Sequence, residues 1–185
     1  MTATNPPIAY TATHKFLHWL IALLVISAVI MGIAMVNVGR GTVQNVLFDL
    51  HRSVGALVLA LAGMRLVWRL LHPVPAPVPG LAPLQALAAR AVHVALYALL
   101  FAMPMLGWAG TSAFGAKIMV FGLFELPPIL ARDRALSATL LGIHGWTGFA
   151  FAGLFTLHAA AALHHHFIRK DATLRRMLPS RWSRG

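Results

Sequence analysis

The 185-residue chain contains no cysteine. This excludes disulfide bridges, iron–sulfur clusters, thiolate zinc sites and the covalent attachment of a c-type haem. Acidic residues are also scarce, with 4 Asp and Glu against 15 Lys and Arg. Only 10% of the residues are charged and 59% are apolar, whereas soluble domains are about one-quarter charged and about 45–50% apolar. The composition therefore argues against a soluble, disordered or collagen-like chain and is typical of an integral membrane protein.

Four apolar stretches reach the length of a membrane-spanning helix, which is about 20 residues. They cover residues 16–36, 46–71, 91–113 and 140–167. So many stretches of helical length argue against a membrane β-barrel. We therefore predict an all-α protein, an integral membrane four-helix bundle that forms one domain over residues 1–185 and ends in a basic tail at 169–185.

The connections between these stretches differ in composition. Four alternating prolines in residues 72–80 forbid a helix and favour an extended loop. Residues 114–135 are mixed in character, and we predict a surface excursion there with a short interfacial helix. Pro104 predicts a kink in the third span.

The net charge of +11 is distributed between the apolar runs rather than over one soluble face. This pattern indicates contact with membrane lipid and argues against nucleic acid as a partner. With four spans both termini lie on one side, and that side collects ten of the fifteen Lys and Arg with one acid. The other side has five cations and three acids. Because cytoplasmic loops are enriched in Lys and Arg, we predict that both termini are cytoplasmic.

Histidine is abundant, with 10 residues, and ionisable groups inside spans are usually functional. His144 and His158 lie 14 residues apart on the fourth span, which places them within about 40° of the same helix face and ~21 Å apart. They are too far apart to share one metal, and two stacked metal centres fit this spacing. Matching residues by depth in the membrane pairs His51 with His144 near the outer side and His18 with His158 near the cytoplasmic side.

Two imidazoles without a nearby carboxylate or thiolate make a poor site for a bare divalent ion. They are the complete axial ligand set of a six-coordinate haem iron. A porphyrin also needs a small residue one turn after each ligand, because side chains tilt towards the helix N-terminus. The four chosen histidines meet this requirement, and His93 does not because Tyr97 follows it. The small residues are Ala22, Gly55, Gly148 and Ala162.

The chain resembles the prokaryotic cytochrome b561 family over about residues 10–180. The resemblance rests on several segments: His18-Trp19, His51, residues 64–73 (MRLVWRLLHP), residues 93–104 (HVALYALLFAMP), residues 157–163 (LHAAAAL), His165-His166 and Lys170-Asp171. The chain departs from the family at Arg169, where an aromatic residue often stands.

This resemblance implies a multi-pass di-haem cytochrome of the bacterial inner membrane, an oxidoreductase that holds two haem b. The family's four haem ligands fall on His18, His51, His144 and His158. The match is closest to small members that oxidise superoxide at the outer face and reduce ubiquinone. The outer face carries Arg40, Arg52, Lys117, Arg132 and Arg134, which would attract a small anion.

Further residues are candidates for contacts with the haem propionates or the quinone. Arginine binds carboxylates in a bidentate manner, and Arg52, Arg65 and Arg69 are suitably placed, although anchoring to lipid phosphate explains them equally well. Lys170, His165 and His166 are candidates on the quinone side. His14 is the rival to His18 as a ligand, and His93 is a candidate for contact with a ligand or quinone.

Three alternatives remain at this point. The chain is also suited to be a haem b subunit that anchors a partner dehydrogenase or hydrogenase and passes electrons to quinone. A metal-ion transporter lined by the same histidines would require mid-membrane carboxylates or broken helices, and the centres of the spans contain no acid. A purely structural anchor would not require four histidines at paired depths.

Overall fold

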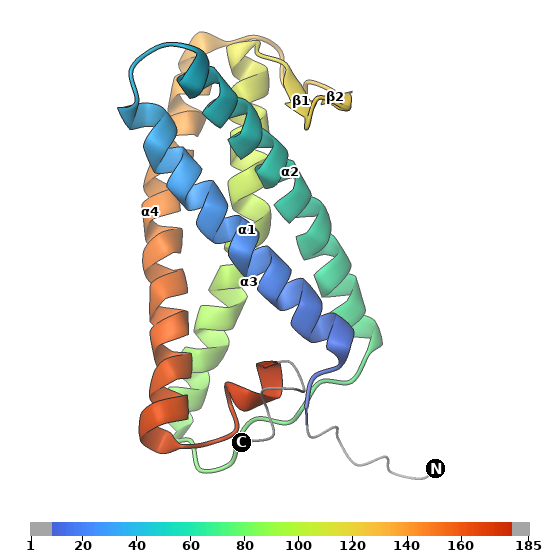
Figure 1. Cartoon of the computed structure of the whole chain (residues 1–185), viewed down its shortest axis with the longest axis vertical. Coiled ribbons are helices and arrows are strands. Elements are labelled where there is room, and N and C mark those ends of the chain that lie inside the picture. The colour runs from blue at the N-terminus through green and yellow to red at the C-terminus, as the bar shows by residue number, and fades with distance from the viewer. Residues whose placement is uncertain (1–8, 179–185) are drawn as a thin grey trace.

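The computed structural model describes residues 9–178 and consists mainly of four long helices (Figure 1). They are α1 (Ala12–Asn37), α2 (Thr42–Leu71), α3 (Pro83–Phe114) and α4 (Arg134–His164). All four are long and apolar enough to cross a membrane. The predicted all-α four-helix membrane bundle is therefore confirmed. The last part of the predicted basic tail, residues 179–185, lies outside the described residues.

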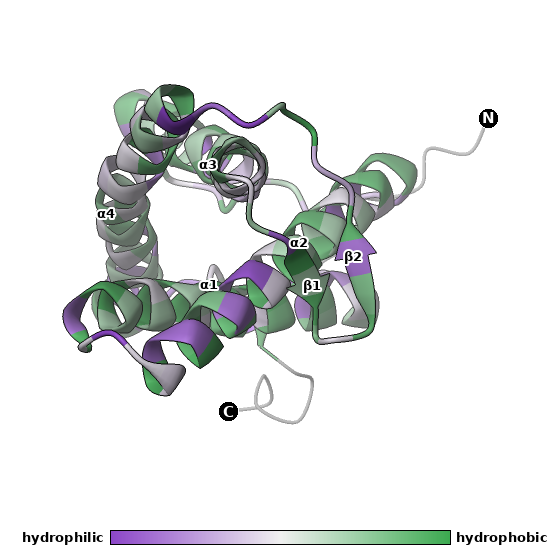
Figure 2. Ribbon diagram, turned by 90° about the horizontal axis from the view of Figure 1, so that it is seen from above, coloured by the Kyte–Doolittle hydropathy of each residue, from purple (hydrophilic) through white to green (hydrophobic). Residues whose placement is uncertain are grey.

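The helices run alternately up and down, and seen from above they surround a common axis (Figure 2). The closest packing is between α1 and α2 and between α3 and α4. The start of α1 and the end of α4 lie at one end of the bundle, called here the terminal end (Figure 1). The connection between α3 and α4 lies at the opposite end, called here the hairpin end.

Large apolar side chains cover the outside of the bundle as well as its core. Buried residues such as Ile21, Val58 and Phe151 form the core, whereas Trp146 is 79% exposed and Leu70 is 76% exposed. Such a continuous apolar exterior is expected where lipid is the surrounding medium.

α3 and α4 begin well before the predicted spans because polar side chains stabilise their first turns outside the apolar stretches. α3 begins at Pro83, eight residues before the predicted start, and the Gln85 side chain accepts a hydrogen bond from the backbone N–H of Ala82. α4 begins after Asp133, whose carboxylate accepts from the N–H of Leu136 at 3.0 Å. The proline-rich residues 73–78 form no helix or strand, as predicted.

The prediction of a short helix within residues 114–135 is wrong, because this segment forms a β-hairpin. Strands β1 (Ile118–Val120) and β2 (Phe124–Leu126) pair antiparallel. The turn residues Phe121 and Gly122 both have positive φ, at 49° and 72°, as a tight hairpin turn requires.

The hairpin is held against α2 by Ser53, which is fully buried. The Ser53 hydroxyl oxygen accepts from the N–H of Phe121 at 2.9 Å and lies 2.7 Å from the carbonyl oxygen of Asp49. Ile118 and Val120, both on β1, are buried. The hairpin therefore packs against α2 at the hairpin end of the bundle.

Candidate functional site

The structure brings His51 of α2 close to His144 of α4 near the hairpin end. Their ring centroids are 5.9 Å apart and the ring planes cross at 85°. His18 of α1 and His158 of α4 form a second pair towards the terminal end, with ring centroids 6.2 Å apart at 77°. We call these the hairpin-end pair and the terminal-end pair. Both pairings are those that matching by depth predicted.

The hairpin-end histidines each bond a backbone carbonyl through one ring nitrogen. His51 Nδ1 lies 3.0 Å from the carbonyl oxygen of Ala28, and His144 Nδ1 lies 3.0 Å from that of Met103. A carbonyl oxygen only accepts, so Nδ1 must carry the proton, and this hydrogen-bond network assigns the tautomer. Nε2 then carries a lone pair, which is the state in which histidine binds a metal.

A glycine lies beside each of these two imidazoles, and the approach is tight at Gly107 and ordinary at Gly32. Gly32 and Gly107 lie four residues after the two carbonyls, on α1 and α3. A Cβ atom would lie 3.4 Å from His51 Cε1 if added at Gly32, and 3.2 Å from His144 Cε1 if added at Gly107. Sequence reasoning missed these two glycines and the carbonyl groups. In the sequence, these contacts are marked only by Gly32 on α1, the helix before that of His51, and by Gly107 on α3, the helix before that of His144.

The spacing of both pairs fits a metal held between two imidazoles. Metal–nitrogen bonds to histidine are about 2.0–2.1 Å, and each ring centroid lies about 1 Å behind its nitrogen, so trans imidazoles have centroids about 6 Å apart. Within residues 9–178 no three histidine or acidic side chains gather in a way that would hold a bare metal ion. A metal with its own equatorial ligands, as in haem, fits this donor set.

A cavity beside the hairpin-end pair supplies space for such a group. It contains about 920 Å³ of empty space, including the part that opens outwards. His51, His144, Arg52 and Gly55 are among its lining residues. A Cβ atom added at Gly55 would meet nothing within 4 Å, so the position one turn after His51 is open, as the predicted porphyrin requires.

The three candidate arginines lie in different surroundings. Arg52 lines the cavity and forms a 3.3 Å ion pair with Asp49. Arg65 is only 9% exposed and donates to the hydroxyl of Tyr97 at 3.0 Å and to the carbonyl of His14 at 3.3 Å. Arg69 lies one turn further along α2. His93 lies beside the terminal-end pair, with its ring centroid 5.2 Å from that of His158.

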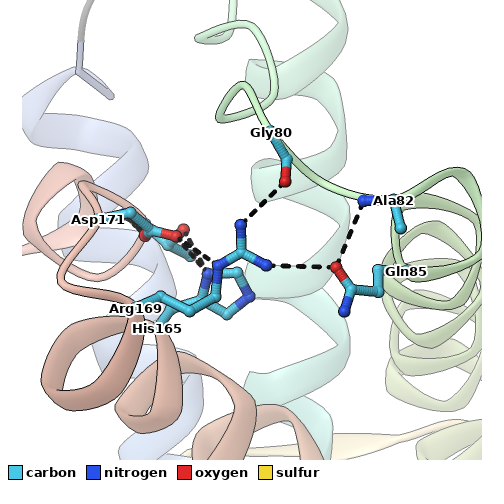
Figure 3. A network of polar contacts seen from close by, with 7 residues as sticks. Gly80, Ala82, Gln85, His165, Arg169 and Asp171 are labelled. Carbon is cyan, nitrogen blue, oxygen red and sulfur yellow. Dashed lines mark hydrogen bonds and ion pairs between the residues drawn. The ribbon is translucent and has the colours of Figure 1, made fainter.

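A polar network closes the terminal end after α4 (Figure 3). The chain passes through a π-helix, His165–Arg169, and the left-handed residue Lys170. Asp171 then lies 2.6 Å from His165 Nδ1 and 3.5 Å from Arg169 Nε. Arg169 also donates to the carbonyl of Gly80 at 3.0 Å and to Gln85 at 3.2 Å. The network thus ties the end of α4 to the loop before α3.

Of the three residues predicted on the quinone side, His165 alone belongs to this network as Figure 3 draws it. The His166 ring packs against Phe167, with centroids 4.8 Å apart. Lys170 provides the left-handed turn that returns the chain towards His165. The network itself was not predicted, since it depends on Gly80 and Gln85 almost 90 residues earlier in the chain.

The Asp171 carboxylate is stabilised in its charged form. Burial raises the pKa of Asp171, but hydrogen bonds from Thr173 and His165 lower it by a larger amount. The net result is a pKa of about 2, against an ordinary value of 3.8. A carboxylate with a depressed pKa favours the folded state above its ordinary pKa, and this contribution disappears as the pH falls through the folded value.

Asp171→Asn is therefore expected to lower the thermal stability of the protein above pH 4 and to have a smaller effect as the pH approaches 2. Thermal unfolding of both proteins in detergent, measured from pH 2 to pH 7, checks this. A stability difference that is constant across the whole range would contradict the assigned pKa.

The cations of the hairpin end are partly paired. Lys117 forms a 2.9 Å ion pair with Glu125 across the hairpin. The guanidinium carbon of Arg134 lies 3.9 Å from the ring centroid of Phe114. Arg132 lines a second cavity together with Lys117 and Glu125. An anion approaching this end therefore meets Arg132 and Arg134 more directly than Lys117.

Comparison with known proteins adds the family context. The chain matches the family described as "Prokaryotic cytochrome b561" over residues 9–180. It is 39% identical over 180 residues to "Cytochrome b561 homolog 2" of Escherichia coli (strain K12), covering 96% of this chain and 95% of that protein. It is 33% identical over 177 residues to "Cytochrome b561 homolog 1" of the same organism, covering 93% and 98%. It is 32% identical over 172 residues to "Probable superoxide oxidase CybB" of Yersinia pestis, covering 93% and 97%.

Proposed function

Because the chain belongs to the prokaryotic cytochrome b561 family, whose members bind haem b and transfer electrons across a membrane, we propose that it oxidises superoxide at its hairpin end and reduces ubiquinone at its terminal end. The name of the Yersinia pestis relative supports superoxide as the electron donor. A metal-ion transporter, the non-redox alternative, receives no support from the family.

The two histidine pairs carry this proposal. We assign one haem b to His51 and His144 and a second haem b to His18 and His158. The single most telling observation is that each pair has the ring spacing of two axial ligands, about 6 Å. These four histidines would hold the haem iron from both sides, and the bound groups would supply one-electron transfer rather than oxygen binding.

The residues of the hairpin end suit a small anionic donor. Arg52 lines the cavity beside His51, and Arg132 and Lys117 line the neighbouring cavity. A positive potential over such a cleft raises the encounter rate of an anion. Superoxide needs no docking surface for a protein, so this arrangement is sufficient for it.

The residues of the terminal end suit a quinone, whose reduction consumes two electrons and two protons. His165 Nδ1 lies 2.6 Å from a carboxylate oxygen of Asp171, and His165 lies seven residues, or about 10 Å of helix, beyond His158. A histidine paired with a carboxylate is able to pass protons from the adjoining aqueous side. Arg69 and Lys170 add positive charge at this end of the bundle, which would stabilise a reduced, anionic quinone.

We propose that the terminal end faces the cytoplasm of a bacterial inner membrane, because ten of the fifteen Lys and Arg lie on that side. A fluorescent reporter fused after Gly185 is expected to be active, since it folds in the cytoplasm, whereas a periplasmic phosphatase fused there is expected to be silent. A reporter pair inserted at Gly122, in the hairpin turn, should give the reverse pattern. An active phosphatase after Gly185 would overturn the orientation.

The proposed reaction is tested with purified, haem-loaded protein exposed to enzymatically generated superoxide. We expect the haem spectrum to become reduced, superoxide dismutase to prevent this, and added ubiquinone to reoxidise the haem. Protein that superoxide does not reduce, but that a partner dehydrogenase reduces, would instead support the alternative of a haem b subunit anchoring that enzyme.

A further inference from the structure

His14 lies one turn before His18 on α1 and is 2% exposed. Its Nε2 atom is buried and has no hydrogen-bond partner within residues 9–178. The rings of Tyr10 and Trp68 pack beside the imidazole, with centroids at 5.7 Å and 6.4 Å. A buried polar atom without a partner is rare in proteins and indicates a missing partner.

The hydrogen bonds of Thr11 reveal which nitrogen of His14 carries the proton. The Thr11 hydroxyl oxygen accepts from the backbone N–H of His14 at 3.3 Å and from Trp68 Nε1–H at 3.4 Å. These two donors occupy both lone pairs of the hydroxyl, so its own hydrogen is left for His14 Nδ1, 2.9 Å away. Nδ1 is then an acceptor, and the proton of the neutral ring lies on Nε2.

This tautomer is the opposite of that in His51 and His144, whose Nδ1 atoms bond carbonyl oxygens. His14 Nε2 is therefore a hydrogen-bond donor without an acceptor rather than a lone pair available to a metal. We therefore keep His18, and not His14, as the proposed haem ligand on α1.

The surroundings define what the missing acceptor is. The buried guanidinium of Arg65 donates to the backbone carbonyl of His14 itself, so positive charge lies beside the imidazole. An anionic oxygen is the preferred partner of such a donor group. Nε2 has no exposed surface, so bulk water and lipid headgroups do not reach it, and the acceptor is a group held inside the bundle. His18 lies about 6 Å away along the helix axis.

Resting on the haem sites of the proposed function, we propose that His14 Nε2–H donates a hydrogen bond to a carboxylate of the haem held by the terminal-end pair. Each haem b carries two propionate carboxylates, and these are anionic groups that the proposed function introduces beside the terminal-end pair. The bond partly neutralises a negative charge near the iron and so favours the reduced form of this haem.

A cycle that changes both partners tests this inference. The unmodified protein and His14→Leu are each loaded either with haem b or with its dimethyl ester, which lacks the carboxylates. The redox state of the haem at the terminal-end pair is then followed against the applied potential in a spectroelectrochemical cell. With haem b, His14→Leu is expected to lower the ferrous-to-ferric ratio at a fixed potential about three- to tenfold. With the ester, the two proteins should titrate alike.

Conservative variants and a neighbouring histidine provide the controls. His14→Gln keeps an N–H donor and should titrate close to the original protein. His72→Leu removes the histidine that stacks on Trp68 at the C-terminal end of α2, and it should leave the titration unchanged. Thr11→Val removes the hydroxyl that donates to His14 Nδ1, so the ring proton is no longer fixed on Nε2, and the titration should shift in the same direction as in His14→Leu. Thr11→Ser keeps the hydroxyl and should leave the titration unchanged.

The outcomes separate this inference from the proposed function. Equal shifts with haem b and with its ester, or no shift with either, would overturn the role of His14 and indicate a buried water as the acceptor. If His14→Leu does not retain this haem, the Thr11 pair decides, and identical titrations of Thr11→Val and Thr11→Ser overturn the inference. Absence of this haem from the unmodified protein would overturn the haem assignment itself.

Discussion

His144→Ala is expected to leave one haem per chain in place of the two that we propose for the unmodified protein, and the haem lost is that of the hairpin-end pair. His158→Ala should lose the haem of the terminal-end pair instead. The reason is that the 14-residue spacing keeps the two α4 histidines ~21 Å apart along the axis, so neither is able to replace the other. The ratio of haem to protein, measured by the pyridine haemochrome method, checks both variants.

His164→Ala is the matched control for these variants, because it removes an α4 histidine that belongs to neither pair and should keep both haems. Redox difference spectra should also show that the two single variants retain different haems. Two haems per chain in His144→Ala would show that the assignment of His144 is wrong.

Gly107→Val offers an independent route to the same result without removing a ligand. A Cβ atom there would lie 3.2 Å from His144 Cε1, so a branched side chain pushes the imidazole away from the carbonyl of Met103. Loss of such a supporting contact lowers metal affinity about 10–100-fold. Gly145→Val is the control, since nothing lies within 4 Å of its Cβ position. Equal haem affinity in the two variants would contradict the role of Gly107.

Helix positions were predictable because long apolar runs require only membrane thickness as a reference. The ends of the helices were less so. The first two turns of α3 are partly polar and depend on Pro83 and Gln85, which hydropathy does not detect. The hairpin of residues 118–126 was missed because three-residue strands carry too little periodicity and because Ser53, which fixes them, lies more than 60 residues away.

The histidine pairs were predictable for a similar reason, since helix direction and depth determine which residues meet. Their supporting contacts were not. The partners of His51 and His144 are backbone carbonyls, which every residue has, and only the folded structure selects Ala28 and Met103. The tautomer of His14 likewise depends on Trp68, which lies on another helix. The candidate ligands were therefore predictable from the sequence, whereas the carbonyl oxygens that orient their imidazole rings are identified only in the structure.

Arg132→Gln combined with Arg134→Gln is expected to slow reduction of the haem by superoxide about three- to tenfold at low ionic strength. Neither of these two cations forms an ion pair with an acidic side chain within residues 9–178, whereas Arg52 and Lys117 do. Electrostatic steering of an anion raises association rates by about 10–10³-fold in strongly charged clefts, and two charges supply the lower part of that range. Stopped-flow or pulse-radiolysis measurement of the rate over a range of salt concentrations checks this.

The matched control is Lys117→Gln with Glu125→Gln, which removes the ion pair of the same hairpin without changing the net charge. Its rate and salt dependence should stay close to those of the unmodified protein. The double arginine variant should also respond less to added salt, because screening acts on the charges that steer the anion. A rate that falls equally in both variants at every salt concentration would mean that the hairpin acts through its structure, and electrostatic attraction of superoxide to this end would then be excluded as the cause.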